Sequence, residues 1–347
     1  MLDSCGPKDI PLLDLERFHA DESERRSFLA ELRSAARDVG FFYLTGHGIE
    51  PRLQQELLQV ATHFFALPEA EKLAIDMVNS PHFRGYTRIA SEITRGRADW
   101  REQIDIGAEG PPLDREPGSP AWTRLQGPNQ WPAALPELRP LVLRWQAAAY
   151  QALACLLRAF LMALGQRVDA LEPIYRDNPH TVLKLIRYPG RSPEVSVQGV
   201  GAHKDSELLT LLLQDSQPGL QVETAAGWTD VLPRAGTVVV NIGEALELAS
   251  DGYLRATPHR VVSPPAGQER LSAAFFLGPQ LDARVPLLQL PPELAAQARG
   301  PERDPNNPLF REVGQNYLKG RLRSHPEVAR RHYADIIEAT STAPAPS

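Results

Sequence analysis

Two histidines and an aspartate in the second half of the chain are of the types that bind a transition metal. His203 and Asp205 lie two residues apart, and His259 follows well downstream. Two imidazoles and one carboxylate can hold one face of Fe(II) and leave the other face open for a co-substrate and oxygen. The same side chains could hold a catalytic zinc ion with water as the fourth ligand. The ligand types therefore predict a metal centre without choosing between these metals.

An arginine and a serine downstream of His259 suggest how an organic acid could bind beside such a metal. Arg270 and Ser272 are two residues apart. A guanidinium can take a carboxylate through two parallel hydrogen bonds, and a hydroxyl can add a third. A dicarboxylate co-substrate needs this combination, so the sequence suggests oxygen chemistry at iron.

Short apolar segments bounded by turn residues must position these side chains. Strand-like runs lie at residues 181–188, 208–213, 237–242 and 271–277. Their length and the turn signals between them are typical of a two-sheet antiparallel jelly roll. If His203 and Asp205 lie near the start of a strand, their spacing puts both side chains on one face, and His259 must come from another strand. We expect the metal between the sheets at the barrel mouth.

The first half of the chain has a helical pattern instead. We expect an edge strand at residues 10–15, an amphipathic helix over 21–39, a strand over 40–45, a second helix ending near 67, a proline-rich and glycine-rich surface connection over 107–140, and a core helix around 146–164. The expected units are an N-terminal region of helices and edge strands at 8–140, a jelly-roll core at 141–280, a C-terminal segment packing on the core at 281–339, and a disordered tail at 340–347.

The composition limits which binding partners and which cellular compartment we expect for this protein. The chain has 347 residues, of which 42% are hydrophobic and 23% charged, and its formal net charge is -6. It has no basic run long enough to follow a phosphate backbone, so we expect no nucleic-acid partner. Polar residues interrupt its longest apolar stretch, and no apolar signal core begins it, so we expect no membrane partner. Two cysteines, Cys5 and Cys155, fit a reducing compartment, and we expect a cytoplasmic monomer.

The chain resembles the isopenicillin N synthase-like family of the Fe(II)/2-oxoglutarate-dependent dioxygenase superfamily from about Ile10 to Tyr333. The similar segments in the N-terminal region are 10–14, 40–44, 46–49 and 84–86, the last being Arg-Gly-Tyr. Those in the core are 187–189, 201–205, 208–214, 218–222, 228–231, 236–244, 258–261 and 270–272. So many matches in order make the resemblance specific. It implies a mainly β fold with flanking helices, built on a double-stranded β-helix, or jelly-roll, core with a helical N-terminal region and a C-terminal helix.

The resemblance also implies residue roles. His203, Asp205 and His259 take the positions of the iron ligands, and Arg270, Ser272 and Tyr188 take the positions that hold the distal carboxylate of 2-oxoglutarate. Ile186 departs from the family pattern, because many relatives carry an asparagine there. The implied cofactors are Fe(II), 2-oxoglutarate as co-substrate, and O2. The candidates for substrate contact are Arg84, Tyr86 and Arg88, because the resemblance places the Arg84-Gly85-Tyr86 segment near the mouth of the site.

The function implied is oxidation of a small-molecule metabolite by hydroxylation, desaturation or cyclisation, with release of succinate and carbon dioxide. Asp205 fills the position that halogenating relatives leave for a halide, so halogenation is disfavoured. Two alternatives stay open. One is an iron oxidase that needs no 2-oxoglutarate and uses Arg270 and Ser272 for its own substrate. The other is a non-catalytic small-molecule-binding protein on the same fold.

Overall fold

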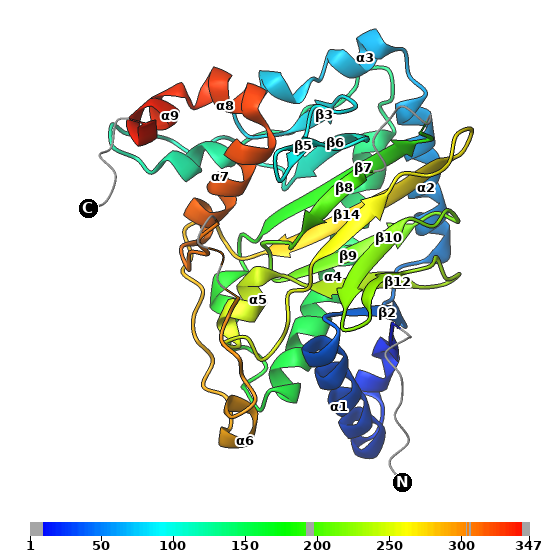
Figure 1. Cartoon of the computed structure of the whole chain (residues 1–347), viewed down its shortest axis with the longest axis vertical. Coiled ribbons are helices and arrows are strands. Elements are labelled where there is room, and N and C mark those ends of the chain that lie inside the picture. The colour runs from blue at the N-terminus through cyan, green and yellow to red at the C-terminus, as the bar shows by residue number, and fades with distance from the viewer. Residues whose placement is uncertain (1–9, 192–197, 303, 305–306, 342–347) are drawn as a thin grey trace.

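Two facing β-sheets with helices packed around them form the protein (Figure 1). This computed structural model describes residues 10–191, 198–302, 304 and 307–341. Within these residues, the larger sheet contains, in spatial order, the strands β1 (Leu12–Asp14), β2 (Phe41–Thr45), β12 (Val238–Ile242), β9 (Leu209–Gln214), β14 (Glu269–Gly278), β7 (His180–Pro189), β6 (Glu102–Gly107) and β3 (Gly85–Thr87). The smaller sheet contains β11 (Gly227–Asp230), β10 (Leu220–Thr224), β13 (His259–Val262) and β8 (Gln198–His203).

The two sheets have the predicted jelly-roll arrangement. Neighbouring strands in both sheets are antiparallel, apart from β1 and β2, which pair in parallel at the edge. A short hairpin of β4 (Ile93–Thr94) and β5 (Arg97–Ala98) contacts β8. The predicted mainly β fold with flanking helices is therefore confirmed.

Strand β7 shows why the larger sheet has one apolar face and one mixed face. Leu183 and Leu185 are fully buried in the main hydrophobic cluster, on the side covered by helices. The alternating residues Lys184, Ile186 and Tyr188 line a cavity between the two sheets. Side chains of a strand alternate between faces, so one strand supplies both the core and the site.

Three long helices cover the outer face of the larger sheet (Figure 1). They are α1 (Glu22–Asp38), α2 (Pro51–Phe65) and α4 (Leu138–Ala163). Phe160 of α4 packs against Phe42 of β2, with ring centroids 6.3 Å apart. Among the described helices, α4 alone is long and apolar enough to cross a membrane, but 56% of its most apolar stretch is buried inside the protein. It is the core helix that the sequence predicts.

The remaining helices are short or lie toward the C-terminus. They are α3 (Glu69–Leu73), α5 (Glu244–Ala249), α6 (Pro292–Ala295), α7 (Val313–Ser324), α8 (Pro326–His332) and α9 (Ala334–Ser341). Helix α7 contacts β4, and its Arg321 forms an ion pair with Asp105 of β6 at 3.0 Å. The C-terminal segment is therefore joined to the N-terminal region beside the cavity.

Three details of the sequence prediction can be compared with these elements. Between residues 107 and 138 the structure has only a short 3₁₀ helix, Ala121–Leu125, as the proline-rich composition indicates. The expected tail begins at 340, but α9 continues to Ser341, and residues 342–347 lie outside the described part. His203 is the last residue of β8 and Asp205 follows in the connection to β9, so the condition considered for this pair, a place near the start of a strand, is not met.

Candidate metal centre

Three side chains converge between the ends of β8 and β13. His203 ends β8, His259 begins β13, and these two residues are cross-strand partners. One ligand atom from each of His203, Asp205 and His259 lies within 4.8 Å of the other two. Asp205 Oδ1 is 3.5 Å from His203 Nε2 and 3.6 Å from His259 Nε2. The structure thus brings together the three residues that the spacing singled out, and their free atoms point at one position.

Hydrogen bonds on the far side of each ligand candidate hold its orientation. His203 Nδ1 lies 2.9 Å from the Gly201 carbonyl, and His259 Nδ1 lies 3.2 Å from the Thr257 carbonyl. Because a carbonyl can only accept, each Nδ1 carries the proton and each Nε2 presents a lone pair. This donor set fits a divalent metal, since imidazole rings that bind metals commonly donate their other N–H to a carbonyl.

The aspartate is held in the same way. Its Oδ2 accepts hydrogen bonds from Thr210 Oγ1 at 2.6 Å and from Asn241 Nδ2 at 2.8 Å, which leaves Oδ1 for the metal. Thr210 lies on β9 and Asn241 on β12, so the larger sheet fixes a ligand candidate in the connection that leaves the smaller sheet.

The charges of the three groups depend on one another. Burial alone would raise the pKa of Asp205, but the nearby His259 and the hydrogen-bonded His203 outweigh burial and hold that pKa well below its usual value. Burial, reinforced by His203, lowers the pKa of His259 to about 4. An ionised aspartate beside a neutral histidine is the state that a metal needs, because a metal competes with protons for its ligands.

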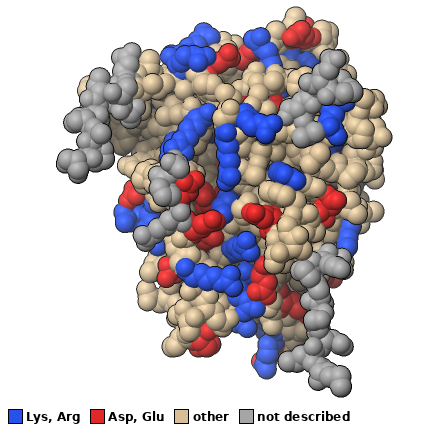
Figure 2. Space-filling model, in the orientation of Figure 1, with Lys and Arg blue, Asp and Glu red and all other residues tan. Residues whose placement is uncertain are grey.

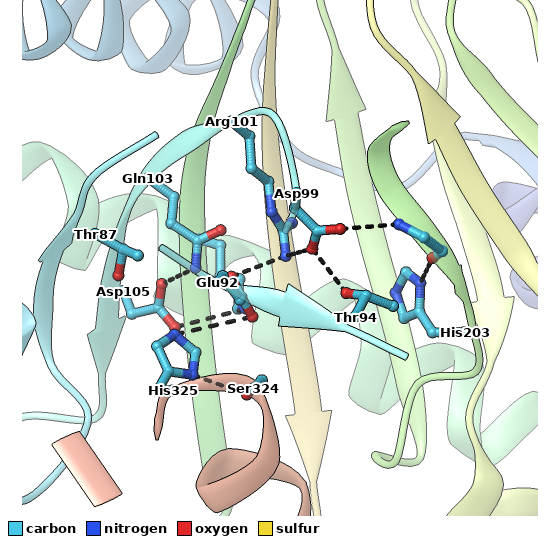
Figure 3. A network of polar contacts seen from close by, with 12 residues as sticks. Thr87, Glu92, Thr94, Asp99, Arg101, Gln103, Asp105, His203, Ser324 and His325 are labelled. Atoms are coloured by element: carbon cyan, nitrogen blue, oxygen red, sulfur yellow. Dashed lines mark hydrogen bonds and ion pairs between the residues drawn. The ribbon is translucent and has the colours of Figure 1, made fainter. Parts of the chain in front are cut away.

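A buried aspartate from outside the jelly roll supports His203 through the backbone (Figure 3). Asp99 is fully buried between β5 and β6, and its Oδ1 accepts from the Gly201 N–H at 3.0 Å. The carbonyl of the same Gly201 faces His203 Nδ1. The hydroxyl of Thr94 donates to Asp99 Oδ2 at 2.7 Å. The N-terminal region therefore fixes the strand end that carries a ligand candidate.

An arginine in the same cavity has a buried charge without an acidic partner. Arg270 has no exposed surface, and its Nη2 donates to Gln214 Oε1 at 2.8 Å. Its Nη1 is 3.4 Å from Ser272 Oγ, and its guanidinium lies 5.0 Å from the centre of the Tyr188 ring. No carboxylate among the described residues forms an ion pair with it, and its Nε has no hydrogen-bond partner. A buried, uncompensated guanidinium favours an incoming carboxylate.

The metal ligands and Arg270 line one cavity of about 1000 Å³. Apolar side chains form the wall near Arg270, namely Ile186, Val200, Leu220 and Val261. Ile186 replaces a polar side chain with a hydrocarbon surface, which suits the methylene groups of a dicarboxylate. The arrangement can hold a metal at one end of a short diacid and a guanidinium at the other.

The wall away from Arg270 is charged. Glu92 forms ion pairs with Arg101 at 2.8 Å and with Lys184 at 3.2 Å, and Arg321 pairs with Asp105 beside them (Figure 3 shows Glu92, Arg101 and Asp105). Across the face seen in Figure 2, acidic and basic side chains are intermixed without a broad patch of one sign.

Two carboxylates in this cavity have no cationic partner. Glu207 follows Asp205 by two residues, and Glu244 is the first residue of α5. Both line the cavity, and no lysine, arginine or histidine of the described chain forms an ion pair with either. Burial raises the pKa of Glu244 to about 7, and burial together with the charge of Asp205 raises the pKa of Glu207 to about 7.

The three side chains expected to touch the substrate do not line the cavity. Arg84 is buried against Gly107, where a Cβ would lie 2.3 Å from its guanidinium. The Tyr86 hydroxyl donates to Glu102 Oε2 at 2.6 Å, and Arg88 is exposed and pairs with Asp76. All three side chains contact other residues of the protein and not the cavity. Their positions therefore do not support the predicted substrate contacts.

Sequence reasoning did not identify three other charged side chains that line the cavity, Glu92, Lys184 and Glu207. Lys184 had a usable signal, since it shares the strand alternation of Ile186 and Tyr188, but that alternation alone is equally compatible with an exposed strand surface. Glu92 and Glu207 had no such signal. Each is brought to the cavity by a connection or hairpin whose path cannot be read from periodicity.

Comparison with known proteins gives a consistent result over nearly the whole chain. Residues 10–134 match the family described as non-haem dioxygenase in morphine synthesis N-terminal, and residues 178–279 match the 2OG-Fe(II) oxygenase superfamily. A 2-oxoglutarate-dependent dioxygenase, frbJ, of Dothideomycetidae sp. is 35% identical, covering 94% of this chain and 93% of its own length. A homoarginine-6-hydroxylase of Arabidopsis thaliana is 33% identical, covering 82% of this chain and 88% of its own length.

Solved structures give the same picture. A full-length Neurospora crassa protein, crystallised in complex with alpha-KG and 5-formyluracil, has a TM-score of 0.72 and 26% identity, with coverage of 93% of this chain and 96% of its own. A putative 2OG-Fe(II) oxygenase family protein from Caulobacter crescentus has a TM-score of 0.73 and 28% identity, with coverage of 90% of this chain and 99% of its own.

Proposed function

Because this chain belongs to the Fe(II)- and 2-oxoglutarate-dependent oxygenase superfamily, we propose that its cavity holds both groups and oxidises a small polar metabolite. In this proposal His203, Asp205 and His259 bind Fe(II), while Arg270, Ser272 and Tyr188 bind the distal carboxylate of 2-oxoglutarate. The observation that carries it is the fully buried Arg270, which lacks an acidic partner and shares one cavity with the three metal-ligand candidates.

When bound, Fe(II) and 2-oxoglutarate supply the oxidising chemistry, in which O2 converts 2-oxoglutarate to succinate and carbon dioxide and an oxygen atom becomes available to the substrate. The residues of this chain supply position. Arg270 neutralises one end of the co-substrate, and the apolar wall around Ile186 excludes water from its methylene groups. Thr210 and Asn241 keep Asp205 Oδ1 directed at the metal position.

The alternative of an iron oxidase that needs no 2-oxoglutarate is disfavoured by the comparisons. A relative that is 35% identical over 94% of this chain is named a 2-oxoglutarate-dependent dioxygenase, and the Neurospora crassa protein has been solved with alpha-KG. A purely binding role is disfavoured by the complete metal-ligand set, which such a role would not need. Relatives named as hydroxylases of homoarginine support hydroxylation as the outcome. The composition supports our further proposal of a cytoplasmic protein with no nucleic-acid or membrane partner, and we take a monomer as the default state.

The test compares the wild type with Arg270→Leu and with Arg260→Leu as a matched control. Arg260 lies next to His259 on β13, but its guanidinium stacks on Trp228 outside the cavity. Calorimetry under anaerobic conditions gives the affinities for Fe(II) and 2-oxoglutarate, and succinate is measured after O2 is admitted. We expect Arg270→Leu to weaken 2-oxoglutarate binding by roughly 100-fold, since a charge-assisted bidentate contact is lost.

In the same experiment, Arg270→Leu should bind Fe(II) normally and Arg260→Leu should behave as the wild type in both titrations. The proposal is wrong if the wild type binds Fe(II) but not 2-oxoglutarate, or if Arg270→Leu binds 2-oxoglutarate with unchanged affinity.

A further inference from the structure

We propose that Glu207 and Glu244 form an anionic subsite that binds a cationic group of the substrate, an ammonium or a guanidinium. This inference rests on the proposed function and names the substrate class for that cavity. It starts from the two carboxylates that face the cavity without a cationic partner.

Most of the other charged side chains that line the cavity have partners within the protein. Their partners are as follows: Arg101 and Lys184 pair with Glu92, Arg321 with Asp105, and Lys204 with Glu302 and Glu247. Asp205 belongs to the metal centre and Arg270 to the co-substrate. Among the described residues, Glu207 and Glu244 form no ion pair with a lysine, arginine or histidine, so their carboxylates can interact with a molecule that enters the cavity.

Loading the cavity with its cofactors does not supply the missing positive charge. The two charges of Fe(II) are balanced by Asp205 and by one carboxylate of 2-oxoglutarate, and Arg270 balances the other carboxylate. Carboxylates taken out of water without a counter-charge are costly. A substrate cation offsets that cost, whereas a neutral or anionic substrate group in the same place does not.

The two carboxylates are held on adjoining segments beside Asp205. The Glu244 N–H donates to the Asp205 carbonyl at 2.7 Å, and the Ala245 N–H donates to the Glu207 carbonyl at 3.2 Å. Between them, Gly243 is so close that a Cβ would lie 2.0 Å from the Glu207 carbonyl oxygen. A cation bound by these side chains keeps the rest of a small molecule next to the metal position.

Glu207 has little freedom to turn toward solvent. The residue is 7% exposed, and its side chain packs near Gly278 at the end of β14, where a Cβ would lie 3.3 Å from Glu207 Cγ. A buried side chain held in this way is preorganised for a ligand, because little conformational entropy is lost on binding. This separates it from an exposed acidic cluster, which water can satisfy.

The experiment uses pairs of molecules of equal shape that differ in charge. The probes are L-arginine against L-citrulline, and L-lysine against L-2-aminoheptanoic acid, in which a methyl group replaces the side-chain ammonium. They are titrated by calorimetry into the full-length protein loaded with Fe(II) and 2-oxoglutarate without O2. We expect the cationic member of at least one pair to bind roughly tenfold more tightly than its neutral partner, as for a hydrogen bond to a charged group.

Matched variants assign that preference to residues. Glu207→Gln and Glu244→Gln keep the side-chain shape and should reduce the charge preference to within about threefold. Glu302→Gln is the control, because this carboxylate also lines the cavity but already pairs with Lys204 at 2.6 Å. It should keep the preference. Thermal unfolding checks that each variant is folded.

The inference is overturned if neutral partners bind as tightly as the cations, if no cationic probe binds, or if the preference survives both Gln substitutions. Its failure can be separated from failure of the proposed function. Absence of 2-oxoglutarate binding in the same loaded samples contradicts the proposed function. Normal binding and conversion of 2-oxoglutarate, without selection for cations, contradicts only the subsite.

Discussion

Removing the hydroxyl of Thr210 should weaken metal binding while leaving every metal ligand in place. Thr210 Oγ1 donates to Asp205 Oδ2 at 2.6 Å, and the residue is 3% exposed on β9. Thr210→Val keeps the branched shape, so the strand and its packing are retained. Asp205 then keeps one of its two side-chain hydrogen bonds, the one from Asn241.

The size of the effect follows from what that bond does. A hydrogen bond to an ionised group contributes about 1.5–3 kcal/mol. Part of this is lost equally from the metal-free protein, because Asp205 is ionised there too. The remainder reflects a carboxylate that is less well oriented, for which losses of roughly 10- to 100-fold in metal affinity are typical. We expect an Fe(II) dissociation constant near the lower end of that range, about tenfold higher than in the wild type.

The assay is anaerobic Fe(II) titration followed by calorimetry, with Thr181→Val as the control. Thr181 is also a buried threonine of the larger sheet, on β7, but it does not line the cavity. Thermal unfolding of both metal-free variants measures the general cost of the substitution. An unchanged Fe(II) affinity in Thr210→Val, or an equal loss in both variants, would refute the reasoning that β9 orients the carboxylate.

Two further predictions test the network in Figure 3. Asp99→Asn should lower Fe(II) affinity by a few-fold to about tenfold, because the Gly201 peptide that orients His203 loses its charged acceptor; Fe(II) titration measures this, and an unchanged affinity would contradict it. Burial lowers the pKa of His325 to about 3, so this side chain favours folding above pH 6.5 and opposes it as the pH falls toward 3. The free energy of unfolding of His325→Gln should therefore fall less steeply with decreasing pH than that of the wild type, by up to about 1.4 kcal/mol per pH unit. Chemical denaturation between pH 6.5 and 4 measures this difference. Parallel pH dependences for the variant and the wild type would contradict the prediction.

Much of the fold could be predicted because it is encoded in local periodicity. The apolar run at 271–277 became β14, and the amphipathic segment at 21–39 became α1. These elements bury one or both faces, and burial imposes a regular pattern on the sequence. The positions of strand ends were less well predicted. His203 lies at the end of β8 because the connection carrying Asp205 turns back into β9, and a two-residue spacing fits either end of a strand.

The metal-ligand candidates were visible because their chemistry restricts residue type. Few side chains bind Fe(II), and His203, Asp205 and His259 are of those types in the order that the resemblance requires. Arg270 could be identified from the sequence for a related reason, since a bound dicarboxylate needs a positively charged side chain as its partner. In both cases the ligand to be bound selects the amino acid, so the sequence alone carries the signal.

On the proposed substrate side of the cavity, no known ligand restricts which amino acids can be present. The residues there could therefore not be identified from the sequence. Glu92 reaches it from the segment before β4, Glu207 from the β8–β9 connection, and Glu244 from the start of α5. An unpaired glutamate and a paired one look alike in a sequence, and only the partners of every neighbouring cation distinguish them. Glu92 is satisfied by Arg101 and Lys184, which leaves Glu207 and Glu244 as the unpaired pair. In the proposed subsite, selectivity depends on which charges the fold leaves without a partner, a property that arises only when distant segments meet.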